Sequence, residues 1–140
     1  MTIEELTSRL TRALQARPEV RLAFLFGSSV SRGVDAAKDV DVAVAFTRSL
    51  GLLEQGGIAT QLARAAEREI DLVDLDEAPT LLRWQVVRNG IALFARDPAE
   101  LVALRARVSL EYFDLEPFLE REAAGLRQAL EKARWSRSTS

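Results

Sequence analysis

The feature that most constrains the fold of this chain is a pair of strand-length apolar segments separated by a short polar stretch. Residues 20–26 (VRLAFLF) form an apolar run that ends directly at Gly27-Ser28. From Asp39 onward, valines occupy every second position and alternate with aspartate and alanine. Segments of this length predict β-strands, and the strict alternation predicts that the second strand buries one face. The chain is therefore expected to be built around a sheet.

Helices and two further strands are predicted to surround this pair. Thr2 and Glu5 form a capping box at the start of an amphipathic helix, which Pro18 ends. Asn89-Gly90 is expected to end a later helix with a residue in the left-handed conformation. The other predicted elements are helices at about 52–67 and 79–88, and strands at about 70–75 and 91–95, the last of them a short edge strand.

The last third of the chain is predicted to be helical. Residues 97–100 (DPAE) supply an N-cap, a proline in the first turn and a glutamate at the third helical position. Pro117 is expected to kink or break this helix, with a second helical piece continuing to about Trp135. A single apolar stripe runs along it, formed by Leu101, Leu104, Val108, Tyr112, Leu115 and Leu119.

This order of elements indicates an α+β (mixed α/β) fold in which a small mixed β-sheet packs on helices. The hydrophobic fraction of 48% and the charged fraction of 29% are ordinary for a globular domain. No internal repeat or low-complexity linker divides the chain. We therefore expect a single domain over residues 1–140, with a helical C-terminal part at about 97–135.

The complete absence of cysteine and histidine excludes several kinds of site. The chain contains no cysteine, so disulfides and thiolate metal sites are impossible. It contains no histidine, which removes imidazole-bound zinc, Ser-His-Asp catalysis and histidine general bases. Any catalysis must use carboxylates, hydroxyls, lysine, arginine or tyrosine.

The charge balance and the hydrophobic pattern limit the partners and the location. The 19 basic and 21 acidic residues leave a net charge of −2, whereas proteins that grip long nucleic acids usually carry a basic stripe. A long DNA or RNA substrate is therefore not expected. The N-terminus lacks the pattern of a signal peptide, and no apolar run approaches the ~20 residues that span a bilayer. We expect a cytoplasmic protein without a membrane partner.

Two aspartates at the start of the second strand are candidate metal ligands. Asp39 and Asp41 lie two residues apart, so their side chains point to the same face of a strand. Carboxylates held this close repel each other, and a divalent cation such as Mg²⁺ relieves the repulsion. Asp71 lies in a later predicted strand and would complete a site for two ions if the two strands are neighbours.

The turn before these aspartates is a candidate phosphate site. Gly27-Ser28 falls where a strand ends and a helix is expected to begin, so backbone N–H groups can cradle a phosphate. The Ser28 hydroxyl can donate to a phosphate oxygen, and Arg32 can add a forked contact to a triphosphate. Taken singly, each feature has a simpler explanation as a turn, a solvated carboxylate or a surface arginine. Their order along the chain favours a site.

At these residues the chain resembles the DNA polymerase β-like nucleotidyltransferase superfamily, whose pattern is an apolar residue, Gly-Ser or Gly-Gly, a spacer and Asp-x-Asp. Here the pattern is Phe26-Gly27-Ser28, a ten-residue spacer and Asp39-Val40-Asp41. The spacer, with Arg32-Gly33 inside it, is most similar to the minimal nucleotidyltransferases, the MNT family. Asp71 matches the family's third carboxylate. Residues 88–94 and 112–114 also resemble this family, so the similarity covers about residues 20–115.

The resemblance implies a specific function. Many MNT proteins are antitoxins of HEPN/MNT toxin–antitoxin systems (type VII-like). They transfer AMP from ATP to a tyrosine of a HEPN ribonuclease toxin, in a site that holds two Mg²⁺ ions. It implies that Asp39, Asp41 and Asp71 are catalytic and bind the metal, while Gly27, Ser28 and Arg32 bind the nucleotide. HEPN toxins carry an Arg-x(4–6)-His motif, which a chain without histidine cannot supply. This chain would therefore be the antitoxin in a heteromeric complex with a HEPN toxin.

One position departs from the family's pattern. The family usually has a small residue, often serine, before the first aspartate, and here that residue is Lys38. A lysine at this position can point away, bind phosphate or compete with a metal for the carboxylates.

Two other functions also fit the sequence. One is nucleotide transfer to a small molecule, as in aminoglycoside-modifying relatives, which usually need more chain to hold the acceptor. The other is a binding module that neutralises a toxin by contact alone, which would have no use for three convergent carboxylates. The C-terminal helical part offers an apolar surface for a partner in every case.

Overall fold

A four-stranded mixed sheet forms the centre of the molecule. The computed structural model describes residues 1–36 and 39–139. Its elements in chain order are α1 (Ile3–Gln15), β1 (Val20–Phe26), α2 (Ser28–Ser31), η1 (Val34–Ala36), β2 (Asp39–Phe46), α3 (Leu52–Ala66), β3 (Glu69–Asp74), α4 (Thr80–Asn89), β4 (Ile91–Ala95) and α5 (Pro98–Thr139). The strands lie in the order β3-β2-β1-β4, with β1 antiparallel to both of its neighbours and β2 parallel to β3. The predicted α+β fold with a mixed sheet is confirmed.

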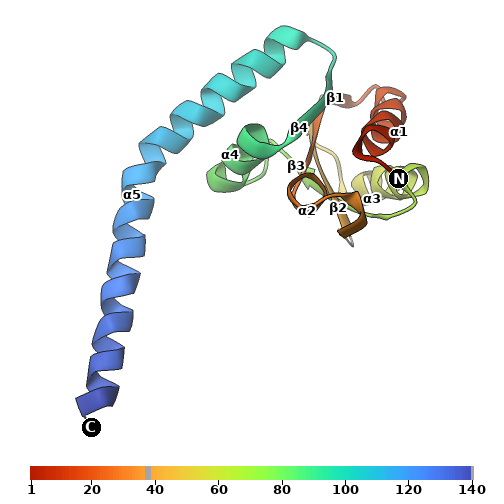
Figure 1. The fold of residues 1–140 in the computed structure, drawn as a ribbon. Coiled ribbons are helices and arrows are strands. Elements are labelled where there is room, and N and C mark those ends of the chain that lie inside the picture. Colours follow the sequence, from red (N-terminus) through yellow and green to blue (C-terminus); the bar gives the residue numbers. More distant parts are fainter. Residues whose placement is uncertain (37–38, 140) are drawn as a thin grey trace.

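Helices cover both faces of the sheet, and each face has its own apolar core (Figure 1). On one face, α1 and α3 pack against alternate residues of β1 and β2. On the other face lie α4 and the first half of α5. The first core includes Leu6, Leu10, Leu14, Val40, Val42, Val44, Ile58 and Leu62. The second includes Leu22, Phe24, Ala43, Val86, Val87, Leu104 and Val108.

Strand β2 is buried more completely than its alternating sequence predicts. Every side chain from Val42 to Phe46 is buried, on both faces of the sheet. The expectation of one buried face was wrong because β2 is an interior strand between β1 and β3, with helices above and below. Small alanines occupy the second face, since α4 and α5 pack closely against it. Only Asp39 and Asp41, at the start of the strand, retain exposure.

The helix ends show one confirmed prediction and one correction. The Thr2 hydroxyl accepts a hydrogen bond from the Glu5 amide at 3.1 Å, which caps α1 as expected. Gly90 follows α4 in extended backbone with φ −76°, so the predicted left-handed stop is wrong. A Cβ at Gly90 would lie 2.5 Å from the Val86 carbonyl oxygen and 3.0 Å from that of Leu25. Glycine is needed there for space, because β4 turns back closely against β1.

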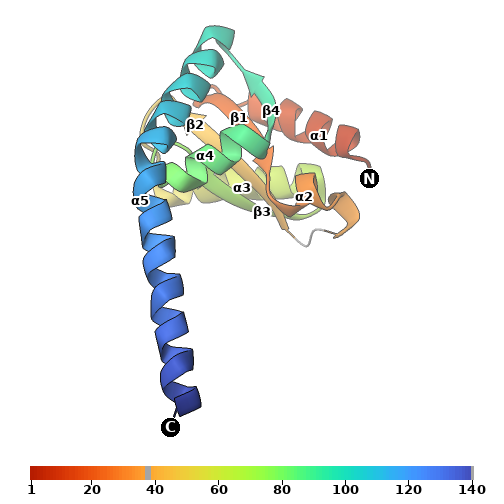
Figure 2. The same ribbon diagram turned by 60° about the vertical axis from the view of Figure 1, so that its left-hand side comes forward.

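Helix α5 begins at the predicted position and ends at Thr139, close to the predicted end at about Trp135. The Ala99 amide donates to the Asp97 carboxylate at 3.0 Å, which caps the helix. Pro117 lies inside one continuous helix, so of the two predicted outcomes the break is wrong, whereas the helix does change direction along its length (Figure 1). The second half projects away from the sheet and from the other helices in both views (Figure 2). Within the described part of the chain, no helix has the length and apolar character needed to cross a membrane.

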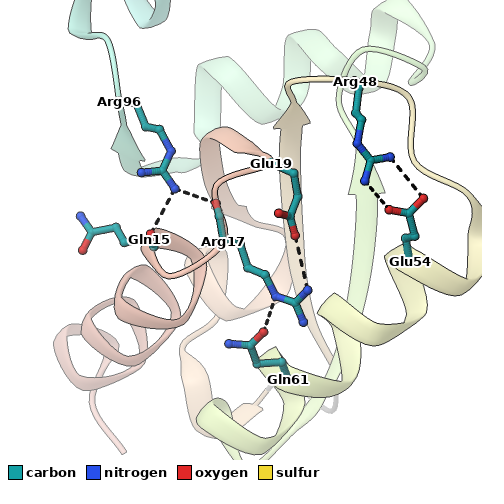
Figure 3. Close-up of polar contacts among 7 residues, drawn as sticks. All are labelled: Gln15, Arg17, Glu19, Arg48, Glu54, Gln61 and Arg96. Carbon is teal, nitrogen blue, oxygen red and sulfur yellow. Dashed lines mark hydrogen bonds and ion pairs between the residues drawn. The ribbon is translucent and has the colours of Figure 1, made fainter.

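Two arginines fasten the end of α1 to the rest of the domain (Figure 3). The Nε of Arg17 donates to the Gln61 side chain of α3 at 2.5 Å, and its Nη1 lies 3.4 Å from Glu19. The Nη2 of Arg96, just after β4, donates to the carbonyls of Gln15 and Arg17 at 3.1 and 2.6 Å. These contacts hold the turn between α1 and β1, and so help to place the strand that leads into Gly27.

Candidate active site at one end of the sheet

The candidate carboxylates meet at one end of the sheet because of strand direction. The parallel strands β2 and β3 both start at this end, and the antiparallel strand β1 finishes there at Phe26. The register places Asp41 beside Asp71, and Asp39 beside Glu69. The two strands are therefore neighbours, as the sequence hypothesis required. Glu69 is a further carboxylate at this edge that the sequence analysis did not single out.

The three predicted carboxylates point to the face of the sheet that α4 and α5 cover. Val40 and Val42 belong to the core beneath α1 and α3, so Asp41 between them points to the opposite face. Asp41 is half-buried, whereas Asp39 and Asp71 are exposed. The site is thus open to solvent on one side and bounded by the sheet on the other.

Asp41 and Asp71 lie side by side on neighbouring strands, and this changes the acidity of Asp41. Partial burial raises the pKa of Asp41, and the negative charges of Asp71 and Asp39 raise it further. A hydrogen bond between the Asp41 and Asp71 side chains acts in the same direction. Two carboxyl groups in this arrangement favour either a shared proton or a cation. The geometry therefore concentrates negative charge where a positive ligand would be stabilised.

Gly27 allows the chain to pass directly over this pair. It has a positive φ of 80°, a conformation that favours glycine. A Cβ at this position would lie 2.1 Å from Oδ2 of Asp41. Both the backbone conformation and the available space therefore require glycine here. The same close approach brings the start of α2 next to the carboxylates.

The predicted phosphate-binding residues lie on this turn. Gly27 is the N-cap of α2, and its carbonyl accepts hydrogen bonds from the amides of Val30 and Ser31 at 3.1 Å. Ser28 is partly exposed at the first position of α2. It directly follows Gly27, which lies against Asp41. Arg32 is exposed at the C-cap of the helix. Lys38 lies outside the described residues.

A cavity of about 260 Å³ opens beside the turn. It lies between the end of β1, the turn and helix α4, and it is lined by Phe26, Gly27, Ser31, Gln85 and Asn89. The sequence analysis did not identify Gln85 or Asn89. Their spacing of four residues puts both amides on one face of α4, but only the tertiary fold shows that this face meets the turn.

The donor set fits a hard divalent cation, and Mg²⁺ in particular. Mg²⁺ binds one or two protein carboxylates, keeps several waters and completes its shell with substrate phosphates. Asp41 and Asp71 supply two oxygen donors in contact, with Asp39 on the same face of β2. Across residues 1–36 and 39–139 no three acidic side chains are grouped closely enough to hold an ion by themselves. Oxygen atoms from the substrate would therefore be needed to complete such a site.

Known proteins are similar to this chain in sequence. The family model described as "Polymerase beta, Nucleotidyltransferase" matches residues 8–99, which include both the turn and the three aspartates. The protein adenylyltransferase MntA of Shewanella oneidensis is 32% identical over 100 residues, which cover 71% of this chain and 72% of that protein.

Solved structures extend the similarity to the fold. A crystal structure of a toxin–antitoxin complex with AMP-PNP contains a chain that is 28% identical, with a TM-score of 0.71, covering 84% of this chain and 94% of that one. In another structure, a tri-AMPylated HEPN toxin of Shewanella oneidensis is in complex with an MNT antitoxin. The matching chain there is 28% identical, with a TM-score of 0.68, covering 86% of this chain and 93% of that one.

Proposed function

This chain belongs to the minimal nucleotidyltransferase (MNT) family of polymerase β-like nucleotidyltransferases, and on this basis we propose that it transfers AMP from ATP to a hydroxyl group of a partner protein. The proposed partner is a HEPN-type ribonuclease toxin, and the proposed acceptor is one of its tyrosines. The chain would then act as the antitoxin of a two-protein system.

The observation that carries this proposal is the pairing of Asp41 with Asp71 on neighbouring strands, with Asp41 directly against Gly27. A half-buried carboxylate beside a second carboxylate is costly for a fold unless a ligand relieves the repulsion. Strand register brings the two residues together from sequence positions thirty residues apart, and the fold reserves a glycine above them. A site that concentrates charge and leaves room for a ligand is what nucleotide transfer requires.

Each residue would have a distinct task. Asp39, Asp41 and Asp71 would hold Mg²⁺, which when bound offsets the charge of the triphosphate and of the leaving pyrophosphate. Asp71 lies exposed at the edge of the pair, where it can accept the proton of the attacking hydroxyl. Gly27 lets the triphosphate approach the backbone, Ser28 donates to a phosphate oxygen and Arg32 adds a positive charge. Positioning and charge neutralisation supply most of the catalysis.

The nucleotide would extend from the carboxylates past Gly27 into the cavity beside α4. The cavity offers the aromatic ring of Phe26 and the amides of Gln85 and Asn89. An aromatic face and amide groups suit a sugar and a base better than they suit a phosphate. The triphosphate would thus lie over the sheet end and the nucleoside against α4.

Relatives support both the protein acceptor and the toxin partner. The similar Shewanella protein is named a protein adenylyltransferase. In a solved complex, a similar chain is bound to a HEPN toxin, and that toxin is tri-AMPylated. The absence of histidine prevents this chain from supplying the Arg-x(4–6)-His motif that the resemblance assigns to the toxins. The ribonuclease would therefore be the partner.

The test is incubation of the chain with ATP labelled in the α-phosphate, Mg²⁺ and the product of the neighbouring gene. We expect the label to appear on the partner and to fall at least about a hundredfold with Asp41→Ala or Asp39→Ala, because the metal ligands are lost. Glu77→Ala is the matched control, since Glu77 is an exposed carboxylate remote from the carboxylate pair.

Two outcomes would contradict the proposal. If both aspartate variants still neutralise the toxin and no label is transferred, the chain is a binding module. If label is transferred only to a small hydroxylated acceptor, the chain is a nucleotidyltransferase with a different substrate.

A further inference from the structure

Arg68 connects two segments that meet at the end of the sheet where the carboxylates lie. It stands between α3 and β3, and its Nη1 donates to the Val34 carbonyl in η1 at 2.8 Å. Its Nη2 lies 3.7 Å from the Asp35 carboxylate, and the arginine side chain is 24% exposed. One side chain from the α3–β3 connection therefore holds the segment between Gly27 and β2.

The segment that Arg68 holds leads directly into the candidate metal ligands. Gly33, with a φ of 97°, turns the chain from α2 into η1. Only two residues of the sequence separate Ala36, the last residue of η1, from Asp39. Val34 is buried in the first core and fixes one side of this segment. Because the ends of elements fray unless they are held, the position of Asp39 depends on what precedes it.

The register of the sheet brings Arg68 to the same ligand along a second route. Asp39 and Glu69 form the first pair of the parallel ladder between β2 and β3. Arg68 immediately precedes Glu69 in the sequence. Its side chain thus fastens the segment that leads into β2, and its backbone leads into β3. Both strands start from one fastening point.

The end of α3 brings Arg68 to this place. Glu67 is the C-cap of the helix and has a positive φ of 55°. The Arg68 amide donates to the Ala63 carbonyl at 3.3 Å, which completes the helix end. A left-handed residue ends a helix sharply. Here it allows β3 to begin at Glu69, two residues after Glu67.

The residue that Arg68 holds belongs to the opposite face of the sheet from the carboxylates. Val34 packs in the first core together with Val40, beneath α1 and α3. Asp41 follows Val40 on β2 and points to the other face. This arrangement gives Arg68 the task of holding the segment, and it leaves the metal and the phosphates to other side chains.

From these contacts we infer that Arg68 is a positioning residue for the proposed nucleotide transfer. It fixes the segment before β2, so that Asp39 is held on the same face as Asp41 and beside the start of β3. The inference rests on the proposed function, because Asp39 is a ligand of the proposed Mg²⁺ site. Mg²⁺ demands near-ideal ligand geometry, so even a small displacement of Asp39 weakens its binding.

Of the two contacts of Arg68, the hydrogen bond to the Val34 carbonyl contributes more. Val34 is 5% exposed, and a buried carbonyl that loses its partner is costly. The Asp35 side chain is 89% exposed, and an exposed ion pair contributes little. Removal of the arginine should therefore matter more than removal of Asp35.

The first measurement is amide hydrogen exchange of the free chain in EDTA. Arg68→Ala should speed the exchange of amides in η1 and in the first residues of β2 by about fivefold to tenfold, as for one lost hydrogen bond. Exchange in β4 should not change. Arg64→Ala is the matched control, since Arg64 is exposed in the last turn of α3. Unchanged exchange at η1 in Arg68→Ala would overturn the inference.

The second measurement is calorimetric binding of a non-hydrolysable ATP analogue at several Mg²⁺ concentrations. At low Mg²⁺, Arg68→Ala should weaken binding about threefold to tenfold, and the difference should close as Mg²⁺ saturates the site. Asp35→Ala should weaken it less than about twofold. A merely structural role would not depend on Mg²⁺. A loss that is equal at all Mg²⁺ concentrations therefore contradicts the inference.

A double variant tests whether Arg68 acts through Asp39. In a chain that already carries Asp39→Ala, the further change Arg68→Ala should leave binding of the analogue nearly unchanged, because the two residues serve one ligand position. Additive losses would show that Arg68 acts elsewhere. Arg68→Lys keeps the charge but not the planar fork, so it should restore binding in part. It takes the place of Arg68→Ala in every comparison if circular dichroism shows that the alanine variant does not fold.

These measurements separate the role of Arg68 from the proposed function. If the unsubstituted chain and Arg68→Ala bind Mg²⁺ and the analogue equally well, only the role of Arg68 is wrong. If the unsubstituted chain binds neither, the proposed function is wrong and this role falls with it. If binding responds to Arg68 as expected but no label reaches a protein acceptor, the role of Arg68 stands and the proposed acceptor is wrong.

Discussion

At the scale of single residues, Asp41 connects stability to the proposed catalysis. Its pKa is raised by burial and by the charges of Asp71 and Asp39. A carboxyl group with a raised pKa in the folded state contributes most stability when it is protonated, and that contribution is lost as the pH rises through the raised value. At neutral pH and without metal, the ionised group therefore works against folding.

This predicts the behaviour of Asp41→Asn. In EDTA at about pH 7.5 the variant should melt at a slightly higher temperature than the unsubstituted chain. Its free energy of unfolding should be higher by less than about 1 kcal/mol, because the site is partly solvated. The difference should shrink as the pH is lowered, because the raised pKa of Asp41 lets the folded chain take up the proton before the unfolded chain does. Mg²⁺ should raise the melting temperature of the unsubstituted chain more than that of the variant. A variant that is less stable at neutral pH would show that Asp41 makes favourable contacts in the free protein.

Gly27 is the residue with the strictest steric requirement in the site. Gly27→Ala adds a Cβ that would overlap Asp41 Oδ2 in a backbone with φ 80°. We expect a loss of about 1–3 kcal/mol in the free energy of unfolding, together with loss of adenylyl transfer. Gly57→Ala is the control: it lies in α3 with open space around it and should stabilise the fold by about 0.5–1 kcal/mol. Equal unfolding curves for both variants would contradict the close contact.

The amides of α4 give a third prediction, which concerns nucleotide binding. Gln85→Ala and Asn89→Ala should each weaken the binding of a non-hydrolysable ATP analogue about threefold to tenfold, as for one lost hydrogen bond. Leu81→Ala serves as the control, because Leu81 is exposed on the same helix and does not line the cavity. Unchanged affinity in titration calorimetry for both amide variants would place the nucleoside elsewhere.

At the scale of elements, the start of α5 depends on one side chain. The Asp97 carboxylate accepts from the Ala99 amide, and the Glu100 amide bonds to the Asp97 carbonyl. Asp97→Ala should cost about 1 kcal/mol in urea unfolding, because an N-cap is removed. Asp97→Asn keeps an acceptor and should cost much less. If both substitutions cost the same, the negative charge of Asp97 matters more than its cap.

Pro117 illustrates how an element can override a local preference. Proline removes one helical hydrogen bond and disfavours the helix interior. The helix nevertheless continues, since its first half is anchored by Leu104 and Val108 in the core. The proline contributes to the change of direction, which carries the second half of α5 away from the sheet (Figure 1).

At the scale of the whole molecule, α5 divides into a part that completes the domain and a part that leaves it. A chain ending at Glu116 retains Leu104, Val108 and the stacked Trp84–Tyr112 pair. It should fold with nearly unchanged stability, because it retains the second core. A chain ending at Asp97 exposes the second core and should not fold, since loss of a single buried leucine already costs about 2–5 kcal/mol. Thermal unfolding of the two truncated chains checks whether residues 1–116 form one domain.

Local sequence patterns determined much of this protein. The length and period of the apolar segments predict the strands, and the residues at the helix ends predict where α1 and α5 begin. The order of Gly27-Ser28 and the aspartates predicts the family, because these residues are close in sequence and their spacing is a local property. The left-handed conformation of Gly90 and the break at Pro117 were predicted wrongly for the same reason: nothing local reports a neighbouring strand or a core.

Only the tertiary structure decided how the site is assembled. The contact between Asp41 and Asp71 depends on the register of two parallel strands joined through α3, which no local pattern encodes. The burial of both faces of β2 depends on its interior place in the sheet, and the cavity beside Gly27 depends on how α4 packs. Pairing and packing join residues that are distant in sequence, so their consequences appear only once the chain is folded.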